Sequence, residues 1–246
     1  MLLSWIIVFS ILGSVGAILG AAMLLSFPAK MRTTLLPCLL SYATGTLLGA
    51  AFLGMIPKSM QQATALSVSS TILAGIVVFF FLEKMIIWRH CHDAECEVHS
   101  SAGPLILIGD AFHNFVDGFV ITAAFLTSVP LGIVASLAVI AHEIPQEVGD
   151  FAILLESGYS RKRALVLNML SSLTTLPGAL IAYFYLGTTM EAVPYILAIS
   201  AASFIYIAVA DLVPSMHHQI GMKSAVQQLL LILAGIVTIA YFQFMH

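Results

Sequence analysis

The chain consists of long apolar runs separated by short polar or proline-containing segments. Each run is close to the ~20 residues that an α-helix needs to cross the hydrocarbon core of a bilayer. Backbone polar groups in lipid must be satisfied within the segment, so each run predicts a transmembrane helix. The pattern predicts eight spans, over approximately residues 3–25, 35–56, 68–88, 104–127, 131–155, 164–186, 193–214 and 225–244. We therefore expect an all-α membrane protein in which residues 1–246 form a single polytopic membrane domain.

Composition supports this class. Hydrophobic residues make up 60% of the 246 residues, charged residues make up 9%, and the mean hydropathy is +1.04. Soluble domains carry roughly a quarter charged residues, so a soluble globular protein is excluded. The net charge of −3 gives no reason to expect a nucleic-acid partner, and three cysteines do not suggest a disulfide framework.

The basic residues predict an orientation. Eight of the nine lie in alternate loops or flank them, namely Lys30, Arg32, Lys84, Arg89, Arg161, Lys162, Arg163 and Lys223. Only Lys58 lies in the other set of loops. The positive-inside rule assigns the richer side to the cytoplasm, which places both termini outside. The first run has no basic start, so we expect a transmembrane helix there and not a cleaved signal.

Spans four and five carry polar residues where lipid-facing helices carry none. Their members are Asp110, His113, Asn114 and Asp117 in span four, and His142, Glu143, Gln146, Glu147 and Asp150 in span five. A carboxylate near the bilayer centre costs about 2.5–3.5 kcal/mol on insertion scales. Neither apolar stretch contains a Lys or Arg, so a bound cation, protons or water must compensate these groups.

The spacing of these residues favours a cation. Residues four apart share a helix face, and the pairs at this spacing are His113 with Asp117, His142 with Gln146, and Glu143 with Glu147. The short link between the two spans makes them antiparallel neighbours, so the two faces converge. Imidazole, carboxylate and amide ligands suit Zn²⁺, Fe²⁺, Mn²⁺, Co²⁺ or Cd²⁺.

Other members of the set have plainer explanations. Asp110, Glu147 and Asp150 are the residues most easily read as structural or cavity-lining, although Glu147 stays among the candidate ligands. Pro145 lacks the N–H that would bond the carbonyl of Ala141, which predicts a kink or break in span five. A carbonyl freed in this way is tolerated where it lines a cavity or coordinates an ion.

Two motifs in this region resemble those of the ZIP family of zinc- and iron-regulated-transporter-like proteins. Residues 113–118 read H-N-F-V-D-G, and residues 142–147 read H-E-I-P-Q-E where the family has H-E-x-P-H-E. The resemblance covers essentially the whole chain. It implies a ZIP-transporter-like bundle with both termini outside, and an elevator-like movement of the metal-bearing helices.

The resemblance also implies a binuclear metal site between spans four and five. The ligands carried over are His113, Asp117, His142, Glu143 and Gln146, with Asn114 completing the second metal position. Asp117 and Glu143 are the expected bridging carboxylates. Gln146 replaces a histidine of the family pattern, which leaves the preference for Zn²⁺ open.

The loop over residues 88–103, on the expected cytoplasmic side, offers a separate group of metal-binding side chains. They are His90, Cys91, His92, Cys96 and His99. Their spacing matches no zinc-finger pattern, so a metal-holding role and an ordinary polar loop both remain open.

We therefore expect a secondary transporter that moves a divalent transition metal into the cytoplasm. Zn²⁺ is the first expectation, with Fe²⁺, Mn²⁺ and Cd²⁺ as alternatives. The metal is the substrate, and we expect no organic cofactor and no enzymatic activity. The expected partners are the metal ion and the lipid bilayer, with a homodimer as an open alternative, in the cytoplasmic membrane of a bacterium.

Three other functions remain open. An intramembrane zinc metalloprotease would use H-E-x-x-H, but Gln146 stands at the second histidine position. A proton-coupled carrier of an organic substrate explains the acids but not the histidines at ligand spacing. A metal sensor would bind metal without transporting it.

Overall fold

The computed structural model describes residues 1–90, 98–186, 189–216 and 221–244, without the side chains of residues 83, 86–90, 98–105, 156 and 244. Within these ranges the regular structure is helical, and no strand occurs. Eight helical segments are long and apolar enough to cross a membrane, which confirms the predicted number of spans.

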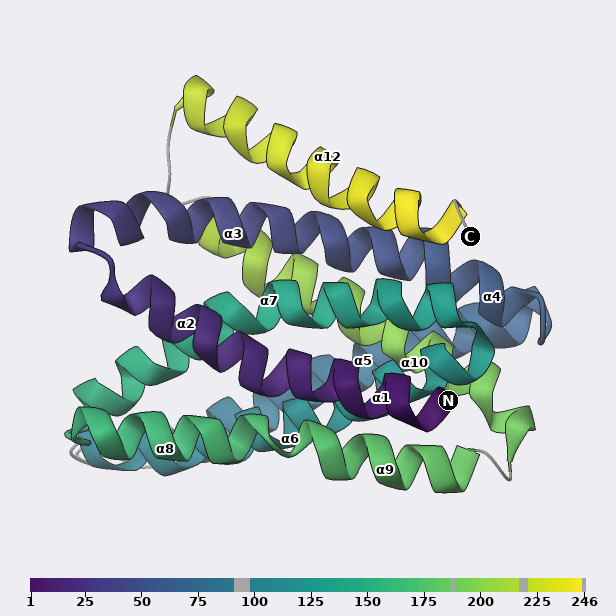
Figure 1. The fold of residues 1–246 in the computed structure, drawn as a ribbon, viewed down its shortest axis with the longest axis horizontal. Helices are drawn as coiled ribbons and strands as arrows, with labels where there is room; N and C mark the ends of the chain where they lie inside the picture. Colours follow the sequence, from purple (N-terminus) through teal and green to yellow (C-terminus); the bar gives the residue numbers. More distant parts are fainter. Residues whose placement is uncertain (91–97, 187–188, 217–220, 245–246) are drawn as a thin grey trace.

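Four of the spans are single helices, and four are divided into shorter segments (Figure 1). The single helices are α5 (Ala65–His90), α6 (Val98–Thr127), α7 (Val129–Glu156) and α12 (Met222–Phe244). The divided spans are α1 (Leu2–Ile11), η1 (Leu12–Gly16) and α2 (Ala17–Ser26); α3 (Ala29–Gly49), η2 (Ala50–Met55) and α4 (Ile56–Met60); α8 (Arg161–Ser172) and α9 (Thr175–Leu186); and η3 (Met190–Ala192), α10 (Val193–Tyr206), η4 (Ile207–Leu212) and α11 (Val213–Met216).

The helices are longer than the apolar runs that predicted them. The second span begins at Ala29, directly after Pro28, where the sequence predicted residue 35. The fourth begins at Val98, where the sequence predicted residue 104. Hydropathy marks only the part of a helix that lies in hydrocarbon, whereas the helix continues into the polar interface.

Short π-helical segments interrupt three spans, and the apolar pattern did not predict them. Two of them, η2 and η4, end two residues before Pro57 and Pro214. A proline removes one backbone donor, and a locally widened helical turn is a common response to that loss. These bulges place irregular backbone in the second and seventh spans, which flank the cavity described below.

Pro145 does not break its helix, whereas the predicted kink stays a prediction. The helix α7 is continuous from Val129 to Glu156, with Pro145 inside it, so the predicted break is wrong. A transmembrane helix tolerates a single lost hydrogen bond because its neighbours hold it in place. The side chain of Pro145 is buried and lies on the wall of the cavity.

Two pairs of glycines allow helices to pack at close range. A Cβ at Gly118 or Gly178 would collide with the backbone of the partner helix, so α6 and α9 are in backbone contact. The same holds for Gly45 and Gly235, so α3 and α12 are also in backbone contact. Small residues permit this approach in membranes, where close packing replaces the hydrophobic effect as the source of association. A Cβ at Gly16, in contrast, would meet only Leu12 of its own span.

The helices α6 and α7 are antiparallel neighbours, as the short link predicted. A single residue, Ser128, separates them, and its side chain accepts a hydrogen bond from the N–H of Leu131 at 3.3 Å. In this way Ser128 caps the start of α7, and Pro130 occupies the first turn, where its missing N–H costs nothing.

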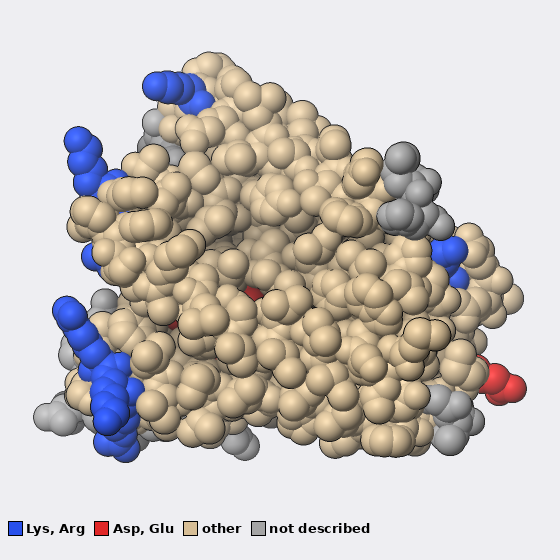
Figure 2. All heavy atoms as spheres, in the orientation of Figure 1, with Lys and Arg blue, Asp and Glu red and all other residues tan. Residues whose placement is uncertain are grey.

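Both chain termini lie at the same end of the bundle, as an even number of spans requires (Figure 1). Most basic side chains gather at the opposite end, where α3, α8 and α12 begin (Figure 2). We call these the terminal end and the basic end. Which of them faces the cytoplasm remains the prediction of the positive-inside rule.

Candidate metal centre

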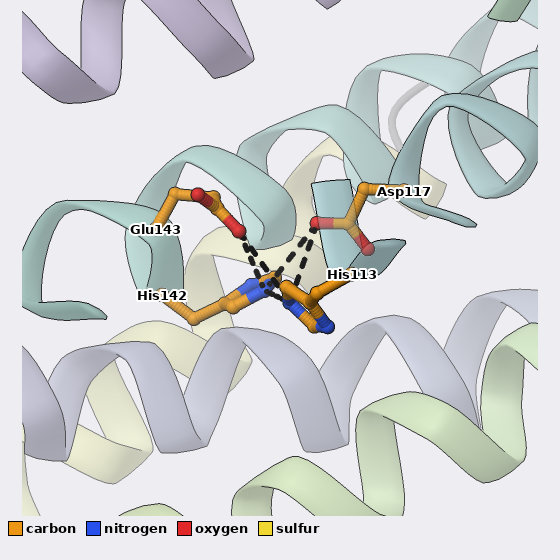
Figure 3. A group of neighbouring side chains, drawn as sticks. All are labelled: His113, Asp117, His142 and Glu143. Atoms are coloured by element: carbon orange, nitrogen blue, oxygen red, sulfur yellow. Dashed lines mark hydrogen bonds and ion pairs between the residues drawn. The ribbon is translucent and has the colours of Figure 1, made fainter. Parts of the chain in front are cut away.

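Four side chains from α6 and α7 form a compact group in the interior of the bundle. Imidazole nitrogens of His113 and His142 and carboxylate oxygens of Asp117 and Glu143 all lie within 4.8 Å of one another. Figure 3 shows the two carboxylates pointing toward the two imidazoles. His113 is partly exposed, and the other three side chains are at most 1% exposed. We call this group the mixed cluster.

The separations in the mixed cluster match those expected around a small metal ion. The Nε2 atoms of the two histidines are 3.1 Å apart, and their distances to Asp117 Oδ2 and Glu143 Oε1 are 3.4–3.8 Å. A tetrahedron with metal–ligand bonds of about 2.0–2.2 Å has edges of about 3.3–3.6 Å. The five nitrogen–nitrogen and nitrogen–oxygen separations therefore differ from tetrahedral edges by only a few tenths of an ångström, and the two carboxylate oxygens lie within 4.8 Å of each other.

The backbone orients one of the imidazoles. His142 Nδ1 lies 2.9 Å from the carbonyl oxygen of Ala138. A carbonyl only accepts hydrogen bonds, so Nδ1 carries the proton and Nε2 keeps its lone pair directed into the mixed cluster. Histidine ligands are commonly held in this way, with the other ring nitrogen donating to a carbonyl or carboxylate.

A second group contains only carboxylates. Oxygen atoms of Asp110, Glu143 and Glu147 lie within 4.8 Å of one another, and all three residues are buried. We call this group the carboxylate cluster. Glu143 belongs to both clusters, so the two are contiguous.

Several of these oxygens have no hydrogen-bond partner within the described part of the chain. They include one oxygen of Asp110 and both oxygens of Asp117, Glu143 and Glu147. Four ion pairs involve these carboxylates, and each joins His113 or His142 to Asp117 or Glu143. Buried carboxylates without donors or basic partners are costly unless a cation or proton compensates them, and a divalent cation suits the two carboxylates of the mixed cluster.

The predicted ligands Asn114 and Gln146 are engaged with Asp110. Asn114 Nδ2 donates to Asp110 Oδ1 at 2.9 Å, and Gln146 Nε2 donates to the same oxygen at 3.2 Å. The hydroxyl of Thr175 lies 3.0 Å from Asn114 Oδ1 and donates to it. A direct role of either amide as a metal ligand remains a prediction.

Asp110 was expected to be structural or cavity-lining, and it does line the cavity described below, but the sequence did not predict that it joins Glu143 and Glu147 in the carboxylate cluster. It lies three residues before His113 and four before Asn114, so it shares the face of α6 that carries the ligands. That spacing was the available signal. The sixth span adds a further polar contact, because Asn168 Nδ2 donates to the carbonyl of Glu147 at 3.1 Å.

A cavity of about 590 Å³ lies beside the mixed cluster. Its polar lining comprises Asp110, His113, His142, Gln146, Asp150, Asp211 and Ser215. The wall also includes Ile106 near the start of α6 and Ile153 near the end of α7, and both of these helix ends lie at the basic end. In Figure 2 acidic atoms are visible inside a hollow between the upper and lower parts of the molecule. The cavity therefore extends from the mixed cluster toward the basic end.

Beside the mixed cluster, the ring of Phe204 in α10 lies edge-on to the imidazole of His142, with 6.0 Å between ring centroids, and Phe204 is fully buried. Toward the terminal end the bundle is closed by apolar packing. Val120 and Phe125 of α6 and Leu131 of α7 continue the buried apolar core toward the terminal end. The mixed cluster is thus open toward one end of the bundle and sealed from the other.

The proposed metal-holding loop cannot be placed. Cys91, His92 and Cys96 lie outside the described residues, and so do the side chains of His90 and His99. The hypothesis of a metal-holding loop therefore remains a prediction.

Comparison with known proteins agrees with the geometry. The family model described as ZIP Zinc transporter matches residues 88–243. A protein named zinc transporter ZIP13 from Pongo abelii is 35% identical over 263 aligned residues, which cover 95% of this chain and 77% of ZIP13. The chain belongs to the ZIP family.

Other ZIP relatives share parts of the chain. Zinc transporter ZIP4 from Mus musculus is 47% identical over 112 residues, which cover 46% of this chain and 17% of ZIP4. Zinc transporter zipt-7.2 from Caenorhabditis elegans is 28% identical over 278 aligned residues, covering 87% of this chain and 60% of the relative. This chain therefore spans less than two thirds of either of these proteins. Membership in the ZIP family supports metal transport, and the relatives are named as transporters and not as enzymes.

Proposed function

We propose that this protein is a secondary transporter that carries a divalent transition metal into the cytoplasm through the mixed cluster between α6 and α7. Zn²⁺ is the first candidate, because the relatives are named zinc transporters. Fe²⁺, Mn²⁺ and Cd²⁺ are further candidates, since the ligand set contains both imidazole and carboxylate groups. The metal is the transported substrate.

The observation that carries this proposal is the geometry of the mixed cluster. Two imidazoles and two carboxylates, buried in a membrane-spanning bundle, are spaced to surround one ion. Two carboxylates balance the charge of a divalent cation, so the ion offsets the cost of burying them. An organic substrate offers no such match to two histidines at ligand spacing.

The shape of the cavity supports release toward the cytoplasm. The cavity extends from the mixed cluster toward the basic end, which the positive-inside rule assigns to the cytoplasm. The apolar packing of Val120, Phe125 and Leu131 lies toward the terminal end. This arrangement corresponds to the inward-facing state of a carrier that alternates between two openings.

The packing of the helices suggests which parts move. The glycine contacts join α6 to α9 and α3 to α12, and both clusters are supplied by α6 and α7 alone. We infer that α6 and α7, together with α1, α2, α8 and α9, slide as one body against α3, α5, α10 and α12. The contact of Phe204 with His142 crosses this boundary, so it must separate when the metal centre opens to the terminal end.

The remaining expectations concern the surroundings of the protein. The outward faces of α5 and α12 are largely exposed and apolar, as expected for helices that contact lipid. A homodimer and the cytoplasmic membrane of a bacterium remain predictions. The relatives compared above are animal proteins, so they do not support the bacterial location.

Metal uptake into proteoliposomes tests the proposal. Zn²⁺, Fe²⁺, Mn²⁺ and Cd²⁺ are offered separately to the wild-type protein and to His113→Ala/His142→Ala. We expect accumulation of at least one metal by the wild type and none by the double variant. Thr122→Val is a suitable control, because Thr122 is buried on α6 but its hydroxyl donates to Ala179 of α9 and not to either cluster.

Two results would contradict the proposal. Binding without accumulation by the wild type favours a metal sensor. Equal accumulation by the wild type and the double variant removes the mixed cluster from the transport route.

A further inference from the structure

The carboxylate of Asp110 is held in a fixed orientation by two amides. Its Oδ1 atom accepts hydrogen bonds from Asn114 of the same helix and from Gln146 of α7. Thr175 of α9 in turn fixes Asn114. Three helices therefore determine the position of a side chain that is 4% exposed.

This arrangement leaves the second oxygen, Oδ2, available. It is buried and has no hydrogen-bond partner within the described residues, although the side chains of Ser171 and Asp150 are close to the Asp110 carboxyl group. The oxygens of the fully buried Glu143 and Glu147 likewise accept no hydrogen bond among the described residues, although the imidazoles of His113 and His142 lie 3.4 and 3.7 Å from Glu143 Oε1 and the side chain of Ser172 is close to the Glu147 carboxyl group. Structural carboxylates are normally satisfied by donors on both oxygens when buried, so these groups lack the partners of a purely structural network.

We propose that Asp110 is a specificity-determining residue for the transported metal. Oriented by Asn114 and Gln146, it completes the carboxylate cluster with Glu143 and Glu147, and this all-oxygen group admits hard divalent cations such as Mn²⁺ alongside Zn²⁺. The inference rests on the proposed transport function and assigns a role to a residue outside the ligand set implied by the family motifs.

The chemistry of the ligands explains the expected selectivity. Carboxylate oxygens suit Mn²⁺, whereas imidazole favours Zn²⁺ and its neighbours in affinity. At position 146 a histidine would add an imidazole, whereas Gln146 supplies an N–H that orients Asp110. With Gln146, the site therefore gains the oriented carboxylate of Asp110, where a histidine at position 146 would provide a nitrogen ligand.

The location of Asp110 makes it accessible to the ion. It lies on the wall of the cavity together with His113 and Gln146, and it approaches Glu143, which belongs to both clusters. An ion that leaves the mixed cluster therefore meets the carboxylate cluster on the side of the cavity.

Competitive uptake measures the proposed role. Proteoliposomes containing the full chain receive Zn²⁺ and Mn²⁺ together, and the ratio of accumulated Mn²⁺ to Zn²⁺ is determined. We expect Asp110→Asn to reduce Mn²⁺ uptake more than Zn²⁺ uptake and so to lower this ratio by at least about tenfold, the lower end of the effect of removing a group around a metal ligand set. Gln146→Leu should lower the ratio in the same direction but by less, because Asp110 remains but is no longer oriented from α7.

A double variant separates a specific role from general damage. If Gln146 acts through Asp110, Gln146→Leu will lower the ratio in the wild-type background and have no further effect in Asp110→Asn. Ser215→Ala is the control: it removes a polar side chain from the wall of the same cavity, its hydroxyl donates to the carbonyl oxygen of Asp211 and belongs to neither cluster, and we expect the ratio to stay unchanged.

The outcomes distinguish this inference from the proposed function. Absence of uptake by the wild type overturns the transport function itself. Transport with an unchanged ratio in Asp110→Asn, or an equal loss of both metals, overturns the role of Asp110 alone. If Asp110→Asn does not fold, an unchanged ratio in Gln146→Leu overturns the inference, and so does an equal shift in Ser215→Ala.

Discussion

At the scale of single residues, Glu143 is the group that both clusters share. Its two oxygens are buried, and their basic neighbours among the described residues are His113 and His142, so we expect a bound cation to offset the cost of burying this carboxylate. We expect Glu143→Ala to reduce metal uptake by more than about 100-fold, since it removes a ligand from each cluster, beyond the range typical of a supporting residue. Radiolabelled metal uptake into proteoliposomes checks this.

The corresponding control is Asn168→Ala. Asn168 contacts the backbone carbonyl of Glu147 and not its carboxylate, so its loss should weaken uptake far less than the loss of Glu143. Comparable uptake by Glu143→Ala and the wild type would remove Glu143 from the metal route.

Gln146 offers a second test at this scale. It stands four residues after His142 on the same face of α7 and lines the cavity. We expect Gln146→His to raise Zn²⁺ affinity relative to Mn²⁺, because imidazole is a stronger ligand for Zn²⁺ than an amide. Isothermal titration of the purified protein with each metal measures the change, and an unchanged ranking of the two metals contradicts the expectation.

The residues of the mixed cluster were predictable because their spacing is local. His113 and Asp117 are four residues apart on one helix, and His142 and Glu143 lie on the next, so one short link was enough to bring them together. The position of Asp110 was harder to predict. Which of its oxygens lacks a donor depends on the amides of Asn114 and Gln146, and hydrogen bonds between helices leave no periodic pattern in the sequence.

At the scale of helices, close packing of glycines explains how α6 is held. A Cβ at Gly178 would collide with the backbone of Phe115 in α6. We expect Gly178→Ala to destabilise the protein by about 1–3 kcal/mol, because backbone atoms cannot move aside as a flexible side chain can. The midpoint of thermal unfolding in detergent measures this effect.

Gly149→Ala provides the control for that substitution. Gly149 lies within α7, and no described atom comes within 4 Å of the Cβ that an alanine would add. The better helix propensity of alanine should leave stability unchanged or slightly higher. Equal midpoints for the two variants would mean that the α6–α9 contact adapts to a methyl group.

The apolar pattern of the sequence predicted the number of helical spans but not their internal irregularities. It predicted all eight spans, because the length of a run is set by the thickness of the bilayer. It did not predict η2 and η4, since a widened turn depends on how Pro57 and Pro214 are accommodated by neighbouring helices. It also predicted a break at Pro145 that α7 does not have.

At the scale of the whole molecule, the basic residues and the cavity distinguish the same end of the bundle from the other. The loops with basic residues, the mouth of the cavity and the exposed side chain of Ser215 lie toward one end, and the apolar seal lies toward the other. The sequence predicted the charge asymmetry. It did not predict the cavity, because which helices pack together depends on the fit of side chains such as Phe204 against His142.

The direction in which the cavity opens leads to a prediction about access from the two sides of the membrane. In a variant with Cys38, Cys91 and Cys96 replaced by Ser, we expect Ser215→Cys to react with a membrane-impermeant thiol reagent in inside-out vesicles but not in intact cells. Ser215 lines the cavity, and the cavity extends toward the basic end, which the positive-inside rule places in the cytoplasm.

Gln61→Cys is the control: it is exposed at the end of α4, near the terminal end, and should react only in intact cells. Reversed labelling of both positions contradicts the membrane orientation. Labelling of Ser215→Cys from the same side as Gln61→Cys contradicts an inward-facing cavity, because water would then reach the metal centre past the apolar seal.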